Sequence, residues 1–276
     1  MKKILSTIYD KNYYLNICLG SDEFKKSAGQ ALSKSVKKIL SRLIISEEDT
    51  VLDLGCGRGD ITLYLAKKAK KVIGIDYSKD AILLARSVQK KSSPTLQRKV
   101  NFMKMDVENL KFKENSIDIV VAIDIFEHLT KEQLEKVMKQ IKFMLKPDGV
   151  LFIHTGTNRI LYDYTYRFYI HPMNILLTTI DKVVFRKSYE PLPKDPRTHE
   201  EKIQHVNEPT YFYLKDLFSR YQFQGLIQTN IGYIKKTNSI KGFVYNFAIT
   251  FHPLSKLFPL STLFGWAFVC NMRNVK

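Results

Sequence analysis

Two kinds of hydrophobic pattern alternate between residues 50 and 155 of this chain. Short apolar runs predict β-strands, and apolar positions spaced three or four apart predict the helices that separate them. The predicted strands cover residues 51–54, 71–76, 100–105, 117–123 and 150–154. Because strand and helix alternate four times, the pattern favours a doubly wound, mostly parallel α/β sheet, which binds its ligands at the carboxyl ends of the strands.

Helix boundaries can be placed from the same pattern. One amphipathic helix is expected from Phe24 to Leu43, and Ser78 caps a second that runs to about Lys90. Thr130 and Gln133 form a capping box for a helix that ends near Leu145. Residues 90–99 are expected to form a polar loop, and residues 147–149 a turn.

The alternation stops after residue 155. Residues 156–209, which contain five aromatic residues between positions 162 and 169, are expected to be an insertion that covers the site. The tyrosines among them would either shape an acceptor pocket or bury the insertion. A helix over 211–221 and strands over 226–234 and 265–272 would then close a seven-stranded sheet.

The stretch VLDLGCGRGDITLYLA at 51–66 reads as strand, glycine turn and helix. Gly55 and Gly57 let the backbone turn sharply and approach a ligand closely. The spacing G-x-G-x-G differs from the G-x-G-x-x-G of dinucleotide sites. Asp53, two residues before the first glycine, would repel a pyrophosphate but would suit a cationic ligand.

Further polar side chains follow the other predicted strands. Asp76, Asp106, Asp124 and His154 end or follow four of the remaining strands. In a parallel sheet they would gather at the same edge as Asp53. A nicotinamide dinucleotide could also use Asp76, but it would leave Asp53 and Asp106 without a role.

Five segments resemble the class I S-adenosylmethionine-dependent methyltransferases of the small-molecule type, which include ubiquinone-biosynthesis O-methyltransferases. These segments are DLGCGRG at 53–59, GIDYS at 74–78, MDVENL at 105–110, IDIFEHL at 123–129 and LKPDGVLFIHT at 145–155. Segments at 9–24, 154–158 and 205–218 are similar to bacterial members from polysaccharide and glycolipid gene clusters. The resemblance implies a Rossmann-like methyltransferase fold.

The resemblance also implies a cofactor, S-adenosyl-L-methionine, which leaves as S-adenosyl-L-homocysteine, and a set of residues that bind it. Asp53 and the backbone of residues 55–57 would hold its amino-acid end, Asp76 both ribose hydroxyls, and Tyr77 the adenine face. Asp106 and the Val107 N–H would bind adenine edges, and Ile123 or Asp124 would lie beside the sulfur. The expected cofactor residues are thus Asp53, Gly55, Cys56, Gly57, Asp76, Tyr77, Asp106, Val107, Ile123, Asp124 and Tyr14. Tyr9, Tyr13 and Tyr14 would form a lid or pack in the core.

Transfer of a methyl group to a hydroxyl requires a base near neutral pKa. The candidates are His128, His205 and His154, each of which could instead be a structural histidine. No metal ligand is assigned, because the spacing of Asp124, Glu127 and His128 is not diagnostic.

These features divide the chain into four parts. Residues 1–48 are an N-terminal helical lid segment, 49–155 the cofactor-binding core, and 156–209 the cap insertion. Residues 210–276 hold the closing helix and strands, with an apolar, basic insertion at 236–263.

Charge and composition bear on location and partners. The net charge is +17, and residues 217–276 contain seven Lys or Arg and no acidic residue. The apolar runs are too short for a signal peptide or a membrane span, so a soluble, cytoplasmic protein is expected. The apolar segment 242–263 either meets an anionic membrane at its inner face or packs on the sheet as a helical hairpin. Oligomeric state cannot be read from the sequence.

Three functions follow as hypotheses. The first is methylation of a small-molecule, sugar or lipid-linked acceptor, with oxygen as the favoured acceptor atom. The second is methylation of RNA or protein, for which the basic charge would help; a specific nucleic-acid substrate is not expected, since no RNA-binding module or Asn/Asp-Pro-Pro-Tyr-like tetrapeptide is present. The third is a binder of the cofactor without catalysis.

Overall fold

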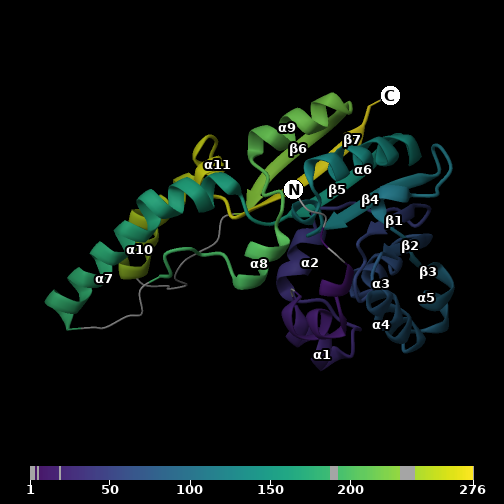
Figure 1. Cartoon of the computed structure of the whole chain (residues 1–276), viewed down its shortest axis with the longest axis horizontal. Coiled ribbons are helices and arrows are strands. Elements are labelled where there is room, and N and C mark those ends of the chain that lie inside the picture. The colour runs from purple at the N-terminus through teal and green to yellow at the C-terminus, as the bar shows by residue number, and fades with distance from the viewer. Residues whose placement is uncertain (1–3, 5, 19, 187–191, 231–239, 276) are drawn as a thin grey trace.

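A computed structural model of the chain describes residues 4, 6–18, 20–186, 192–230 and 240–275 (Figure 1). Its centre is one seven-stranded sheet in the order β3-β2-β1-β4-β5-β7-β6. The strands are β1 (Thr50–Leu54), β2 (Lys71–Asp76), β3 (Val100–Lys104), β4 (Ile117–Ile123), β5 (Leu145–Thr155), β6 (Phe223–Asn230) and β7 (Ala267–Asn274). The first five in chain order pair in parallel, and β7 pairs antiparallel with both β5 and β6. The expected doubly wound, mostly parallel fold is confirmed.

Alternate residues of each central strand point to opposite faces of the sheet, and each face has its own core. Leu52 and Leu54 of β1 belong to the core that α6 and α9 cover, whereas Val51 belongs to the core under α2, α3 and α4. Because both faces are covered, the middle of β4 and most of β1 and β2 are apolar. Several of the polar side chains of the site stand at or just after the carboxyl ends of these strands.

The helices of the sheet layers are α1 (Ser21–Ser27), α2 (Lys34–Leu40), α3 (Asp60–Ala66), α4 (Lys79–Lys90), α5 (Pro94–Lys99), α6 (Lys131–Met144) and α9 (Tyr211–Arg220). Both predicted caps are present. Ser78 accepts a hydrogen bond from the Ala81 N–H, and Thr130 forms a capping box with Gln133.

Two predictions about local structure were wrong. The single helix expected over 24–43 is two helices, because Ala28 and Gly29 both take left-handed backbone conformations that end α1. The Gly29 N–H donates to the Phe24 carbonyl, as in a helix C-cap. The polar loop expected over 90–99 contains α5, which Ser93 caps and Pro94 starts.

Strand boundaries also differ from the predictions. Residues 147–149 form an irregular part of β5, which begins at Leu145 and shifts register against β4 near Ile117. β6 begins at Phe223, three residues before the expected start. The last predicted positions of that strand, 231–234, lie outside the described residues.

A second group of helices extends away from the sheet (Figure 1). It consists of the π-helical segment η5 (Leu161–Ile170), α7 (His171–Phe185), α10 (Ile240–Thr250), the short turn η6 (Leu254–Lys256) and α11 (Leu260–Phe264). These elements, called the projecting unit below, share a core that includes Tyr162, Tyr166 and Tyr245. The remaining α-helix, α8 (His199–Gln204), lies between this unit and the sheet. Short helical segments also occur at η1 (Ser6–Ile8), η2 (Tyr13–Ile17), η3 (Val107–Asn109) and η4 (Phe126–His128). Throughout the described ranges, every helix is too short or too polar to cross a bilayer.

Gly59, which starts α3 beside the glycine turn, should tolerate no side chain. Its φ is +83°, and an added Cβ would lie 2.7 Å from the Phe102 ring and 2.8 Å from the Ala85 Cβ. We expect Gly59→Ala to lower the free energy of unfolding in urea by about 2–4 kcal/mol. Gly20→Ala is the matched control, since φ is +76° there but the nearest atoms are 3.5 Å away. It should lose only about 1 kcal/mol, and equal losses in the two variants would contradict the steric explanation.

Candidate active site

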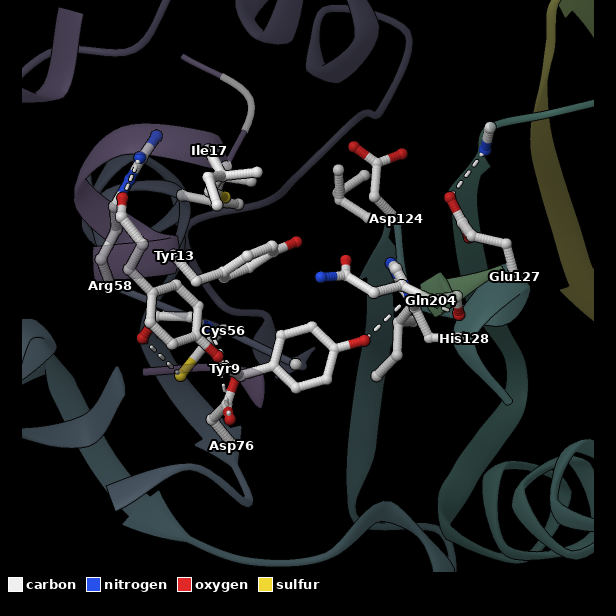
Figure 2. A pocket seen from close by; sticks show the side chains of 18 of the residues that line it. Tyr9, Tyr13, Ile17, Cys56, Arg58, Asp76, Asp124, Glu127, His128 and Gln204 are labelled. Atoms are coloured by element: carbon white, nitrogen blue, oxygen red, sulfur yellow. Dashed lines mark hydrogen bonds between the residues drawn. The ribbon is translucent and has the colours of Figure 1, made fainter. Parts of the chain in front are cut away.

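One cavity of about 550 Å³ opens at the carboxyl ends of the parallel strands (Figure 2). Its lining combines these strand ends with the N-terminal residues up to Gly20 and with residues around α8. Seven acidic residues and one basic residue, Arg58, are among the described lining residues. The acidic ones are Asp60, Asp76, Asp106, Asp124, Glu127, Glu200 and Glu201. In a protein whose net charge is +17, this cavity is suited to a cationic ligand.

Asp76 is the buried acceptor at the end of β2. Its carboxylate accepts the Gly57 N–H at 3.0 Å and the Ser78 N–H at 2.8 Å, and the Tyr14 hydroxyl lies 3.4 Å away. Burial raises the pKa of Asp76 to about 6, although these hydrogen bonds oppose the shift. The side chain therefore fixes the glycine turn against the start of α4.

Asp53 lies behind the glycine turn rather than among the lining residues. Its carboxylate is almost fully buried and accepts a hydrogen bond of 2.6 Å from the Thr62 hydroxyl of α3. Burial raises the pKa of Asp53 to about 7. Gly55, Cys56 and Gly57, which follow it closely in the chain, line the cavity, whereas Asp53 does not.

The other predicted cofactor residues share the same lining. Tyr77, Asp106, Val107, Ile123 and Asp124 all border the cavity. Asp106 accepts the Glu108 N–H at 3.0 Å, which turns the chain at the end of β3. The structure thus brings together every predicted cofactor residue except Asp53, which stands one layer behind.

An N-terminal strap, residues 9–14, crosses this cavity. The Ser78 hydroxyl donates to the Tyr9 carbonyl at 2.7 Å, and the Arg58 guanidinium donates to the Tyr14 carbonyl at 2.7 Å. Tyr9 and Tyr14 are both buried, and Tyr13 packs edge-on against each of them. Sequence reasoning missed Arg58, although its place between two glycines of the turn was a usable signal.

Two of the three candidate histidines meet at the far side of the cavity. The rings of His128 and His205 are 5.0 Å apart, centre to centre. His128 Nδ1 lies 3.1 Å from the Gln204 carbonyl and 3.0 Å from the Tyr9 hydroxyl (Figure 2). Burial lowers the pKa of His128, and it lowers that of His205 to about 4. The role of the Gln204 carbonyl was not predictable, because a backbone acceptor has no sequence signal.

His154 occupies a different position. Its Nδ1 lies 2.5 Å from the Asp124 carboxylate, and the two side chains pair at the ends of β5 and β4. His154 is buried, whereas the Asp124 side chain is 32% exposed. Burial alone would lower the pKa of His154, but the carboxylate of Asp124 raises it instead. Glu127, buried beside them, accepts from the Thr155 hydroxyl and the Gly156 N–H, both at 2.9 Å. Burial and the nearby charge of Asp124 raise the pKa of Glu127 to about 8.

The same corner could hold a metal ion. One potential ligand atom from each of Glu127, His128 and His205 lies within 4.8 Å of the other two. Two imidazoles and a carboxylate would suit Zn²⁺ or a similar first-row cation. His205 was not in the set considered from sequence, since 77 residues separate it from His128.

Only part of the predicted cap insertion, residues 156–209, lines the cavity. Among the described residues of 156–209, those that line it are Gly156, Thr198, Glu200, Glu201, Gln204 and His205. Tyr162 and Tyr166 pack inside the projecting unit, with Trp266 against them. Tyr162 and Tyr166 are therefore buried in the insertion, whereas Tyr164 is 59% exposed, and none of the three lines the cavity.

Comparison with known proteins agrees with the fold. The family model described as "Methyltransferase domain" matches residues 51–149. Phosphoethanolamine N-methyltransferase of Plasmodium falciparum is 27% identical over 152 residues, which are 54% of this chain and 55% of that protein. Ubiquinone biosynthesis O-methyltransferase of Coxiella burnetii is 31% identical over 129 residues, 47% of this chain and 52% of that protein. The chain therefore spans about half the length of the curated relatives it matches.

Solved structures show the same fold at low sequence identity. The [4+2]-cyclase SpnF superposes with a TM-score of 0.58 at 14% identity, over 98% of this chain and 94% of that one. An S-adenosylmethionine-dependent methyltransferase from Mesorhizobium loti gives a TM-score of 0.54 at 14% identity, over 87% of this chain and 98% of that one.

Residues 51–149 are therefore a methyltransferase domain of the class I, S-adenosylmethionine-dependent type, as the five sequence segments predicted. The cofactor of this domain is S-adenosylmethionine.

The buried carboxyl of Asp53 should make stability depend on pH. Its pKa of about 7 in the native protein exceeds the value of 3.8 for an exposed carboxyl. Between these two values the native protein holds a proton that the unfolded chain has released, so stability falls as the pH rises. From pH 4 to pH 7, Asp53→Asn should lose roughly 2–4 kcal/mol less stability than wild type in urea titrations.

Asp22→Asn, which removes an equal charge at an exposed site, is the control and should follow the wild type. A pH dependence shared by all three proteins would show that Asp53 is ionised like an exposed carboxyl.

Proposed function

We propose that this protein transfers a methyl group from S-adenosylmethionine to a hydroxyl of a small molecule, a sugar or a lipid-linked acceptor. One observation carries the proposal: a single cavity joins the predicted cofactor residues to a cluster of histidines. In Figure 2, Asp76 and Cys56 lie on one side of the cavity, and Asp124, Glu127 and His128 lie on the other.

The residues on the first side fit the cofactor. A carboxylate has about four lone-pair positions, and the two backbone N–H groups on Asp76 leave acceptor capacity for a ribose diol. Asp106 and Val107 follow on the next strand, where an adenine edge would lie. The excess of carboxylates around the cavity fits the ammonium and sulfonium charges of this cofactor.

On the second side, His128 is positioned to act as the base. In the proposed tautomer, Nδ1 of His128 donates to the Gln204 carbonyl, which can only accept, and the nearby Tyr9 hydroxyl does not donate to Nδ1. Nε2 would then be left as the acceptor. Burial lowers the pKa of the ring, which keeps it neutral at pH 7, while the charge of Asp124 partly opposes this shift. His205 is a weaker base, and His154 is held by Asp124.

The chemistry that the cofactor supplies is an electrophilic methyl group on a sulfonium. Nε2 of His128 would accept the proton that the acceptor hydroxyl loses as its oxygen takes the methyl group and S-adenosylhomocysteine leaves. The protein would contribute mainly alignment and exclusion of water, and the N-terminal strap with Tyr9 and Tyr14 is placed for the latter.

The names of the relatives include both N- and O-methyltransferases, so they do not favour one acceptor atom. The choice of oxygen therefore depends on the proposed role of His128 as a base. We also propose that the protein works at the inner face of an anionic membrane. The net charge and the acid-free residues 217–276 support that location.

Loss of Asp76 should weaken cofactor binding. We expect Asp76→Ala to raise the Kd for S-adenosylmethionine by about 10–100-fold in calorimetric titrations, because hydrogen bonds to a charged acceptor are lost. Asp106→Ala should weaken binding separately, and Asp216→Ala on the outer helix α9 should leave it unchanged. Equal affinity in the wild type and both cavity variants would refute this cofactor site.

Loss of His128 should affect turnover and leave cofactor affinity nearly intact. Wild type would be screened with labelled S-adenosylmethionine against glycans, lipid-linked sugars, quinols and RNA, and His128→Ala tested on the acceptor found. We expect a 10²–10⁴-fold lower kcat, the usual contribution of a general base. His199→Ala, an exposed histidine at the start of α8, is the control.

Two outcomes would contradict this assignment. Unchanged turnover in His128→Ala would remove His128 from the mechanism, and incorporation of label into RNA alone would replace the proposed acceptor class.

A further inference from the structure

The projecting unit has an apolar outer surface that its own packing does not use. On α7, Leu176, Ile180, Val183 and Val184 recur at spacings of four, three and one, which places them on one side of the helix. The exposed fractions of Leu176 and Val183 are 53% and 74%. Side chains of this size are seldom gathered on a surface that stays in water.

The opposite side of α7 holds the unit together. Asn174 is buried and donates its side-chain amide to the Tyr245 hydroxyl of α10, and Asn174 also accepts the Leu192 N–H. The Tyr169 hydroxyl donates to the Ala248 carbonyl. The inner side of the helix pair is therefore fixed by specific contacts, so the outer side is presented in a defined position.

α10 repeats this division. Tyr245 and Ile249 are buried, whereas Phe243, Val244 and Phe247, spaced one and three apart, are exposed. Past α10, the turn that leads to α11 exposes Leu257 and Phe258. Each part of the projecting unit thus buries one apolar side and exposes another.

The charges around this surface are of one sign. Arg167, Lys182, Arg186 and Lys256 are all exposed. Residues 240–264 contain no acidic residue. Of the two acidic residues in η5 and α7, Asp181 is buried and Asp163 pairs with Arg159 and Arg197. An identical surface on a second copy would carry the same positive charges, which disfavours self-association. Anionic lipid headgroups would complement them.

We propose that the outer faces of α7 and α10 dock the protein on an anionic lipid surface. The apolar side chains enter the headgroup and acyl boundary while the surrounding Lys and Arg contact phosphates, as in interfacial helices. Docking requires no helix to cross the bilayer. It places the projecting unit on the lipid and leaves the cavity, which lies at the sheet, accessible to an acceptor anchored in the same membrane. The docking itself does not depend on methyl transfer.

Vesicle flotation tests the proposal with the full chain. Wild type should float with phosphatidylcholine vesicles that contain phosphatidylglycerol, and less with phosphatidylcholine alone or at high salt. Leu176→Asp/Val183→Asp should reduce the bound fraction at least about tenfold, since two charges would enter the apolar boundary. Lys182→Glu should reduce it only in vesicles with phosphatidylglycerol.

The matched control is Ile44→Asp/Leu83→Asp, whose exposed fractions of 89% and 54% are similar but whose positions are on the sheet domain. It should float like wild type. All variants should keep the thermal midpoint and the S-adenosylmethionine affinity of wild type, so that a docking defect is distinguished from failure of the cofactor site.

Three results would overturn the proposal. They are no flotation of the wild type, equal loss in the control, and a dimer in sedimentation velocity that Leu176→Asp/Val183→Asp dissociates. The last result would make a second copy of the chain the occupant of this surface.

Discussion

The carboxylate of Asp76 is the contact on which the rest of the site depends. It is buried at the end of β2 and accepts the backbone N–H groups of Gly57 and Ser78. These two bonds fix the glycine turn after β1 and the start of α4 relative to each other. The Tyr14 hydroxyl lies against the same carboxylate, so the N-terminal strap is placed from this point as well.

Burial of several carboxylates in one place has an electrostatic consequence. Asp53, Asp76 and Glu127 all have raised pKa values because burial disfavours their charged forms. Arg58, the one described basic lining residue, is directed at the Tyr14 carbonyl and at Asp60. A bound cationic ligand would compensate the negative charge of these carboxylates. Binding of such a ligand would account for an acidic cavity in a strongly basic protein.

The cavity and the proposed docking surface lie in different parts of the molecule. The cavity is built from strand ends, the N-terminal strap and α8, whereas the exposed apolar faces belong to α7 and α10. In the chain, α10 and α11 lie between β6 and β7, so this part of the projecting unit joins the sheet through those two strands. A surface inserted at that point can change without disturbing the parallel strands that hold the cofactor residues. The fold alone does not fix the reaction, since a [4+2]-cyclase shares it.

The local sequence pattern by itself predicted the sheet and most of the residues proposed to bind the cofactor. Strand patterns, caps such as Thr130 and acidic residues at strand ends can be recognised from residues that are close in sequence. Parallel strands then bring those ends to one edge of the sheet. All three candidate histidines line the cavity, and tertiary structure alone decided their partners, because His128, Tyr9 and Gln204 come from distant segments. It also left Asp53 out of the cavity lining, ended α1 at a left-handed Ala28, and buried Tyr162 and Tyr166 in the projecting unit while leaving Tyr164 exposed. These outcomes depend on which long-range contacts bury each side chain, and no local pattern records those contacts.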